Sequence, residues 1–293
     1  MKGNDFFIQA AKKPPFTKLH PKVAAFFKDY LSQEKVIEFN GRYVLNTHFP
    51  PYPSPAFDNL VAQFGSIGNI GERRLYSVTL AVTNRCMYNC WHCYNAGRNQ
   101  QDLSLPALKR VIGELQDFGA VRVTLSGGEP LLRDDLESIA GYFDDSTFLN
   151  LNTTGFGLTH ERAKRLKDNG LFAVGVSIDS FNAEKHDRMR GKKGAFKIAA
   201  NALEAASQSG LYPYIVSVAT HEFLQPENFE YFIQNAKEYG ALEVHLLEPC
   251  PTGKLAGQQD VVLGKQDRKR ILDYQSEIAQ DEDLPILSSF SYL

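Results

Sequence analysis

The segment Cys86-Met87-Tyr88-Asn89-Cys90-Trp91-His92-Cys93 places three thiols on one short stretch, directly after the apolar run 78–82. The chain of 293 residues contains only 4 cysteines, so this grouping stands out. Soft thiolate ligands suit iron–sulfur clusters, and three of them can hold three irons of a cubic cluster while another iron stays free. The thiols are too close together for an ordinary disulfide framework, and clustered cysteines in cytosolic chains more often bind metal. The segment therefore predicts a metal or cluster site at the end of a strand.

Composition limits the classes of protein to which the chain can belong. Hydrophobic residues make up 43% of the sequence, an ordinary share for a globular protein with a sizeable core. The formal net charge of -2 indicates neither a nucleic-acid surface nor a polybasic membrane patch. No apolar run approaches the roughly 18 residues that cross a bilayer, and the N-terminus leads into no signal-peptide core. We therefore expect a cytoplasmic protein that binds neither nucleic acid nor membrane.

The pattern of residues 1–75 predicts an N-terminal extension before the main domain. His20-Pro21 opens a helix with apolar residues at helical spacing, and Asn40-Gly41 between two β-rich runs predicts a β-hairpin. The proline-rich segment 49–55 can continue neither element, so we expect an extended linker there. The extension is expected to pack against the main domain, and a role in substrate recognition is the alternative.

From about residue 76 short apolar runs alternate with helical periods, a pattern typical of parallel strands joined by helical crossovers. The predicted strands are 78–82, 121–125, 148–151, 173–178, 214–219 and 243–247. Periodicity alone leaves two α/β architectures open, a doubly wound sheet and a barrel. Six units are too few for a complete barrel, and the Rossmann glycine fingerprint is absent after the first strand. In both architectures ligands bind beyond the C-terminal ends of the strands.

Polar and glycine-containing segments follow several of these strands. They are 126–130, 152–155, 177–180 and, farther along the chain, 187–191. Glycines let a backbone approach a ligand, small polar groups at a strand end hydrogen-bond a ligand or cap a loop, and a guanidinium group fits a carboxylate. Each segment also has a plain structural interpretation as a tight turn, a loop cap or a solvated loop. Their position at the same edge as the cysteines favours one shared site.

A structural zinc site is the plain alternative for the cysteines. Cys86, Cys90 and Cys93 would then need His92 or Cys250 as the remaining ligand. Zinc sites usually show two separated ligand pairs, which is not the spacing here. His92 taken alone is as readily a solvated loop histidine.

The CxxxCxxC spacing of Cys86, Cys90 and Cys93 closely resembles the signature of the radical S-adenosylmethionine (SAM) enzymes, and the resemblance covers roughly residues 76–255. It implies a partial (β/α)6 TIM-like barrel for this core, followed over 256–293 by a helix and the start of a further region. It also implies that the three thiolates hold a [4Fe-4S] cluster, whose remaining iron binds the amino and carboxylate groups of SAM.

Other segments resemble further motifs of the family. The residues that the resemblance places against SAM are Gly127, Gly128, Glu129, Asn152, Thr154, Ser177, Asp179, Arg190 and, by its backbone position, His92. Glu129 lies in a GGEP-like segment, and its carboxylate is a sensible acceptor for the SAM amino group. Arg190 would meet the SAM carboxylate, with Arg188 as the competing arginine.

The activity implied by the resemblance is reductive cleavage of SAM to methionine and a 5′-deoxyadenosyl radical, which removes a hydrogen atom from a substrate. The overall pattern is nearest to the SPASM-type group, which modifies peptides, proteins or cofactor precursors. The resemblance also implies an electron donor such as ferredoxin or flavodoxin. Many relatives continue into a region with auxiliary iron–sulfur clusters, and no such cysteines follow here. We expect a chain that ends before that region, with a naturally short member as the alternative.

Cys250 and Lys254 lie after the sixth predicted strand, in a PxGR-like segment with lysine where arginine is usual. Cys250 is a candidate ligand of an auxiliary cluster, but one thiol cannot hold a cluster, so a buried structural cysteine is favoured. Two other functional classes stay open. One is an iron–sulfur electron carrier that never meets SAM, against which the segment with Glu129 argues, and the other is a zinc-stabilised binding module.

Overall fold

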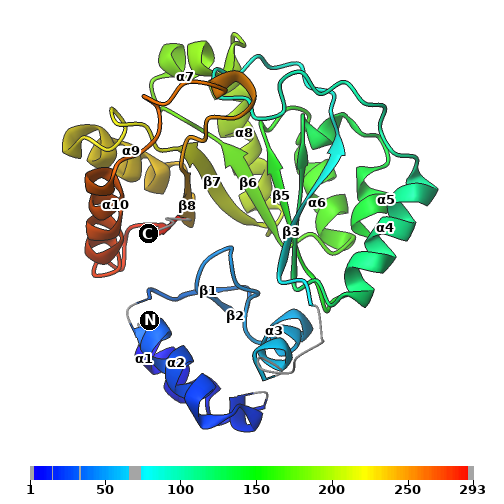
Figure 1. The fold of residues 1–293 in the computed structure, drawn as a ribbon, viewed down its shortest axis with the longest axis vertical. Helices are drawn as coiled ribbons and strands as arrows, with labels where there is room; N and C mark the ends of the chain where they lie inside the picture. Colours follow the sequence, from blue (N-terminus) through cyan, green and yellow to red (C-terminus); the bar gives the residue numbers. More distant parts are fainter. Residues whose placement is uncertain (1–2, 15, 33, 66–73, 290–293) are drawn as a thin grey trace.

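Seven parallel strands form the centre of the protein in a computed structural model that describes residues 3–14, 16–32, 34–65 and 74–289. The strands are β3 (Ser77–Thr83), β4 (Arg122–Gly127), β5 (Phe148–Thr153), β6 (Ala173–Ser177), β7 (Tyr212–Val218), β8 (Glu243–Leu247) and β9 (Ile286–Ser289). They pair in their order along the chain, and each neighbouring pair is parallel. A doubly wound sheet reverses this order at a switch point. The sheet is therefore a partial barrel with β3 and β9 as its edge strands (Figure 1).

The sheet contains the six predicted strands and one more. β9 pairs with β8, and Ile286 lies opposite Glu243. The sequence indicates the β-like character of the run 287–293, but such a run does not reveal its partner strand. Residues 290–293 of this run lie outside the described residues. The expectation of six βα units holds for β3 to β8, and β9 extends the partial barrel beyond it.

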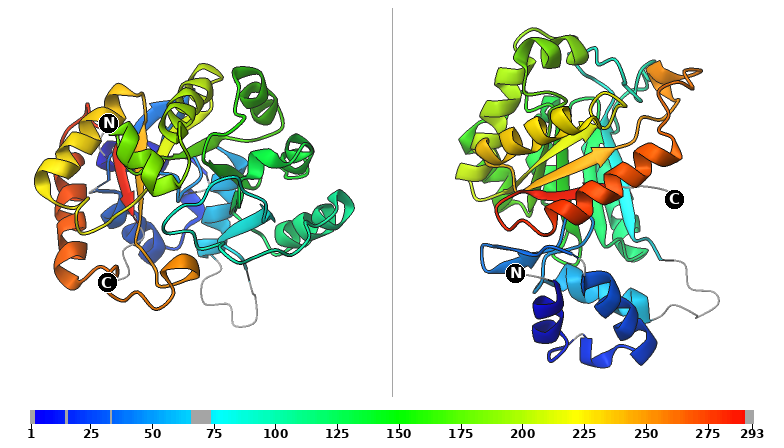
Figure 2. Two further views of the ribbon diagram at one scale, coloured as in Figure 1. Left: turned by 90° about the horizontal axis from the view of Figure 1, so that it is seen from above. Right: turned by 90° about the vertical axis from the view of Figure 1, so that its left-hand side faces the viewer.

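Helices cover the outer side of the sheet and enclose the main hydrophobic core with it (Figure 2). They are α4 (Leu105–Asp117), α5 (Leu136–Ala140), α6 (His160–Asp168), α7 (Ala183–Arg190), α8 (Ala195–Gln208), α9 (Pro226–Glu238) and α10 (Lys265–Ile278), with the short 3-10 turns η2 (Pro130–Leu132) and η3 (Gly253–Leu255). In α4, Pro106 occupies the first turn, and Leu108 and Ile112 are buried in the core. None of the helices in the described part of the chain is long and apolar enough to cross a membrane.

The N-terminal extension lies at the N-terminal ends of the strands, below the sheet in Figure 1. It consists of α1 (Gly3–Ala10), η1 (Phe16–Lys18), α2 (Pro21–Ser32), the hairpin β1 (Ile37–Phe39) and β2 (Arg42–Val44), and α3 (Pro55–Gly65). α2 and the hairpin are as predicted, and Asn40 and Gly41 both have the positive φ that a type I′ turn needs. α1 and α3 were not predicted. In the segment 49–55, Tyr52 bridges to Tyr43, but Pro55 already opens α3 instead of continuing the linker.

A turn after the hairpin closes the lower end of the partial barrel. Thr47 is fully buried, and its N–H and Oγ1 both donate hydrogen bonds to the Glu243 carboxylate of β8 at 2.8 Å. The Thr47 carbonyl accepts from the Arg122 guanidinium of β4 at 2.6 Å and from the Asn150 amide of β5 at 3.2 Å. Three strands are thereby bonded to one residue of the extension. The domain boundary at residue 75 stays a prediction. These hydrogen bonds join the extension before that boundary to the sheet after it.

Candidate functional site

The cysteine loop follows β3 at the C-terminal end of the sheet, opposite the extension (Figure 1). Cys86, Cys90 and Cys93 are free thiols; Cys86 is exposed, Cys90 is buried and Cys93 is intermediate. All three line one cavity of about 430 Å³, here called the cysteine cavity. The structure thus brings the three predicted ligands to the edge where parallel α/β proteins bind their ligands.

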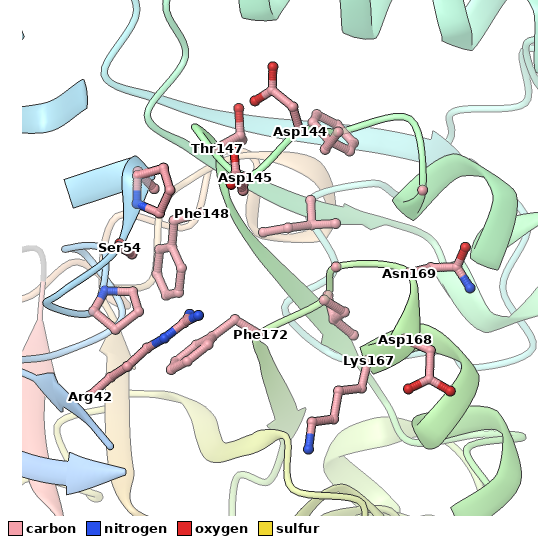
Figure 3. A pocket seen from close by; sticks show the side chains of 18 of the residues that line it. Arg42, Ser54, Asp144, Asp145, Thr147, Phe148, Lys167, Asp168, Asn169 and Phe172 are labelled. Carbon is pink, nitrogen blue, oxygen red and sulfur yellow. The ribbon is translucent and has the colours of Figure 1, made fainter. Parts of the chain in front are cut away.

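A larger cavity of about 710 Å³ lies at the opposite end, between the hairpin and the loops that precede β5 and β6 (Figure 3). There the Arg42 guanidinium lies 6.0 Å from the centre of the Phe172 ring, and Asp144 and Lys167 line the same cavity from other segments. None of the predicted site residues lines this cavity. Its place at the N-terminal ends of the strands argues against it as the active site, despite its size.

Gly127 and Gly128 hold the start of the cysteine loop against the end of β4. The N–H of Gly128 donates to the Thr83 carbonyl and the N–H of Glu129 donates to the Arg85 carbonyl, both at 2.8 Å. A Cβ on Gly128 would lie 2.2 Å from the Arg85 carbonyl oxygen. The sequence predicts that these glycines allow close approach to a ligand, whereas the structure shows them allowing close approach between two backbones.

Two further segments hold the other side of the loop. At the end of α7, the Arg190 carbonyl accepts from the N–H of Asn89 at 3.1 Å. After β8, the N–H of Lys254 donates to the Cys93 carbonyl at 3.0 Å, and its ammonium group donates to the Asn89 carbonyl at 3.0 Å. Lys254 therefore holds the cysteine loop in place. Cys250, in the same segment, is exposed, so the expectation of a buried structural cysteine is wrong.

Most of the residues that the resemblance places against SAM line the cysteine cavity. These are His92, Gly127, Gly128, Asn152, Thr154, Ser177 and Arg190. Sequence reasoning missed Tyr94, whose hydroxyl donates to the Gly127 carbonyl at 3.3 Å, and Val218 at the C-terminal end of β7. Val218 lies within a predicted strand end, so the rule that ligands gather there would have found it, whereas nothing in the sequence singles out Tyr94.

Glu129 lies behind the cysteine cavity and does not line it. Its side chain is fully buried, and its carboxylate accepts hydrogen bonds from the hydroxyls of Thr153 and Thr154 at 2.6 Å each. The backbone N–H groups of Thr154 and Leu131 donate to it as well, at 2.7 and 3.0 Å. Burial raises its pKa, and these four bonds favour the ionised form. The carboxylate is thus engaged in joining the ends of β4 and β5, which differs from its expected role as an acceptor for SAM.

Asp179 also lies behind the cavity, where it orients Arg190. The Arg190 Nη2 donates to Asp179 Oδ1 at 2.8 Å, and both side chains are buried. Burial alone would raise the pKa of Asp179, but the Arg190 charge, the two neighbouring histidines His92 and His186 and the Val218 N–H together more than offset this, so the pKa lies below its ordinary value. Arg190 Nη1 also lies 3.9 Å from Cys90 Sγ. Arg188 is exposed and faces a different cavity, so the geometry favours Arg190 as the cation beside the cysteines.

Several buried polar atoms around the cysteine cavity have no hydrogen-bond partner among the described residues. Among them are His92 Nδ1, Asn95 Oδ1 and Arg190 Nε, on residues that line the cavity, and Asp179 Oδ2 behind it. Buried polar groups in proteins are normally satisfied, so a group of orphans marks a place where a ligand or water belongs. SAM offers amino, carboxylate and ribose groups, and the residues present therefore fit a ligand of that kind.

The thiols also fit a metal cluster better than a single ion. Burial raises the pKa of Cys86 to about 11 and raises that of Cys90, so a metal must displace their protons on binding. Within the described ranges, no three His, Cys, Asp or Glu side chains are grouped as a single metal ion requires. A multi-iron cluster makes a different demand, because each thiolate binds its own iron. Of the two residues considered as a further zinc ligand, His92 lines the cysteine cavity and Cys250 does not.

Comparison with known proteins agrees with this geometry. The family model described as "Radical SAM superfamily" matches residues 80–244, more than half of the chain. An AdoMet-dependent heme synthase of Methanosarcina barkeri (strain Fusaro / DSM 804) is 32% identical over 209 residues, which are 70% of this chain and 59% of that protein. The Fe-coproporphyrin III synthase of the same organism is 37% identical over 134 residues, 44% of this chain and 33% of that protein. The chain thus spans between 33% and 59% of the length of these relatives.

Among solved structures, Streptococcus suis SuiB bound to its precursor peptide SuiA has a TM-score of 0.64 and 13% sequence identity to this protein. The match covers 99% of this chain and 66% of that chain. At this level of identity the similarity shows a shared fold. The family match, the parallel partial barrel and the three grouped thiols together establish that the chain belongs to the radical SAM superfamily of enzymes.

Proposed function

We propose that Cys86, Cys90 and Cys93 hold a [4Fe-4S] cluster in the cysteine cavity and that SAM binds beside it. One observation carries this proposal: the three thiols of one loop and the predicted SAM residues of several other segments line the same cavity. The family membership supports both cofactors, and the orphaned polar atoms around the cavity fit a polar ligand.

Different side chains around the cavity would bind different groups of SAM. Arg190 offers a cation, oriented by Asp179, that suits the SAM carboxylate. Ser177 and Thr154 offer hydroxyl groups at the ends of β6 and β5. Glu129 contributes indirectly, because it holds Thr154 in position through two hydrogen bonds.

With both cofactors bound, the available chemistry is one-electron reduction of the sulfonium, which gives methionine and a 5′-deoxyadenosyl radical that removes a hydrogen atom from the substrate. An external donor such as ferredoxin or flavodoxin would supply the electron. The chain contributes a fixed cysteine loop, a cation for the SAM carboxylate and a cavity whose inner wall is buried.

The reaction proposed for this protein belongs to peptide, protein or cofactor maturation. The two relatives are named for the synthesis of haem and of Fe-coproporphyrin III, and SuiB is a structure bound to a precursor peptide. These names support both a small-molecule and a peptide substrate. Auxiliary clusters, which some SPASM-type enzymes carry, would be held outside the cysteine cavity.

The test is anaerobic reconstitution with iron and sulfide, followed by reduction with dithionite in the presence of SAM. We expect a brown, iron-containing protein that releases 5′-deoxyadenosine. Cys90→Ala should lose the cluster absorbance and the product, because Cys90 is the buried thiol beside Arg190. Cys250→Ala is the matched control, since this exposed thiol does not line the cavity and its loss should change neither.

Two results would contradict the proposal. A protein that binds the cluster through Cys90 but never cleaves SAM, even with candidate substrates, would be an electron carrier. A protein that takes up zinc in place of iron, and retains that zinc in Cys90→Ala, would show that the cysteine cavity does not hold an iron–sulfur cluster.

A further inference from the structure

A second cavity of about 570 Å³, here called the side cavity, lies next to the cysteine cavity at the same end of the strands. It is formed by α7, the loop after β7, the start of α9 and part of the segment between β8 and α10. Val218 lines both cavities, and Trp91 and Asp179 belong to the wall on the side of the cysteine loop. Its volume is in the range of sites that enclose small organic molecules.

Aromatic side chains provide most of the apolar wall of the side cavity. Phe232 of α9 packs against Phe181 and Phe223, with ring centres 5.0 and 4.9 Å apart. Tyr231, directly before Phe232 in α9, is 55% exposed, so its ring is available to a ligand. Such rings bind a partner of similar shape through large contact area and favourable edge or face geometry.

Among the charged side chains of the side cavity that the structure describes, Arg188 is the cation without an ion pair, and Asp260 is a carboxylate without one. Lys185 is paired with Glu222 at 2.8 Å. Arg188 is exposed at the rim, and it forms no ion pair or side-chain hydrogen bond with any other residue that the structure describes. A guanidinium group that lines the same cavity as several aromatic rings suits a carboxylate on an apolar body, because its planar fork can bind both carboxylate oxygens.

We propose that the side cavity binds a part of the substrate that carries an aromatic ring and, on a short chain, a carboxylate, with the ring against Phe223, Tyr231 and Phe232 and the carboxylate on Arg188. This inference rests on the proposed function, since the cysteine cavity next to it supplies the reacting centre. The two cavities are separated by Val218 and the Asp179–Arg190 pair, so the group bound in the side cavity is a part of the substrate that does not react. Binding energy from such remote groups positions the reacting part.

Calorimetric titration of the reconstituted holoenzyme tests this assignment without any turnover. The probe is hydrocinnamate, a phenyl ring on a short carboxylic acid, and its amide is the uncharged analogue of the same shape. We expect hydrocinnamate to bind more tightly than the amide, and Arg188→Gln to weaken hydrocinnamate by about fivefold and the amide hardly at all, the size expected for a solvent-screened ion pair. Tyr231→Ala should weaken both probes.

Arg110→Gln on α4 is the matched control, because it removes an exposed arginine outside the side cavity and should leave both affinities unchanged. SAM added without reductant should not displace hydrocinnamate, since it occupies the other cavity. Equal binding of acid and amide, an Arg188→Gln affinity equal to that of Arg110→Gln, or displacement by SAM would each overturn the proposal. A protein that binds hydrocinnamate through Arg188 but releases no 5′-deoxyadenosine would refute the proposed function and keep this site. A protein that releases 5′-deoxyadenosine but binds hydrocinnamate equally well without Arg188 would refute this site and keep the proposed function.

Discussion

The two ends of the partial barrel bury carboxylates in opposite ways. At the C-terminal end, Asp179 is paired with Arg190, yet its second oxygen has no partner among the described residues. At the N-terminal end, Glu243 is equally buried, but both of its oxygens accept hydrogen bonds, from Thr47 and Ser288. Unsatisfied buried groups indicate a missing ligand or water, and satisfied ones indicate permanent structure. For these two carboxylates the difference supports a ligand or water beside Asp179 and closure of the barrel around Glu243.

The largest expected effect tests whether the C-terminal end depends on close backbone packing. In Gly128→Ala the new Cβ would collide with the Arg85 carbonyl oxygen, 2.2 Å away, so the start of the cysteine loop must move. We expect loss of most of the iron–sulfur absorbance after reconstitution, measured against protein concentration. Gly113→Ala on α4 is the control, because its Cβ meets no atom within 4 Å and alanine favours a helix by about 1 kcal/mol. Full cluster content in Gly128→Ala would remove the argument for this packing.

The next effect tests the N-terminal end. Glu243→Ala leaves the donors of Thr47 and Ser288 without their acceptor in a fully buried site. We expect the free energy of unfolding to fall by about 3 kcal/mol, measured by urea denaturation, while the iron content of the folded protein stays unchanged. Glu238→Ala, on the exposed side of α9, should change stability by less than about 0.5 kcal/mol. If Glu243→Ala lost its cluster without losing stability, the two ends would not be separate in function.

Glu129 offers a sharper test, because it belongs to the C-terminal end but is satisfied like Glu243. In Glu129→Gln an amide group replaces an oxygen that accepts from Thr153 or Thr154. We expect a loss of about 2 kcal/mol in unfolding free energy together with weaker SAM binding, measured by equilibrium dialysis without reductant. A direct contact with SAM would instead weaken SAM binding and leave the urea midpoint unchanged.

These sites also show what the sequence can and cannot reveal. The strands β3 to β8 were predictable because each is a short apolar run with clear ends, and the three thiols were predictable from their spacing alone. Two partners of Glu129, Thr153 and Thr154, lie at the end of β5, 24 and 25 positions along the chain, and Thr47 contacts Glu243 across 196 positions. No local pattern records such contacts. The sequence could therefore place Glu129 at the right strand end without showing where its carboxylate points.

The same limit explains the missed elements. α3 follows a proline-rich segment, and a proline that ends one element also suits the first turn of a helix, so Pro55 has two interpretations. β9 is short, and only its pairing with β8 shows that it extends the sheet. In each case the deciding fact is a tertiary contact.

The last prediction concerns the pH dependence of stability, which distinguishes the buried carboxylates of the two ends. Burial raises the pKa of Glu243 to about 7 from its ordinary 4.5, so the folded state holds this proton more tightly than the unfolded state. The resulting stabilisation is complete below about pH 4.5 and is lost as the pH rises through about 7. Urea midpoints between pH 5 and pH 8 should therefore fall for the wild type relative to Glu243→Gln, which keeps the shape without the ionisable group.

The neighbouring His245 does not affect this change of the urea midpoint with pH. Burial lowers the pKa of His245 to about 3, so its ring is neutral throughout the range, and it is present in both proteins. The other histidines are also present in both proteins, so they cancel in the comparison. A constant difference between wild type and Glu243→Gln from pH 5 to pH 8 would mean that Glu243 keeps one protonation state over the range. The N-terminal end would then bury a permanent charge, as the Asp179–Arg190 pair does at the other end. The two carboxylates would differ only in their hydrogen bonds, since both oxygens of Glu243 accept one and the second oxygen of Asp179 has no partner among the described residues.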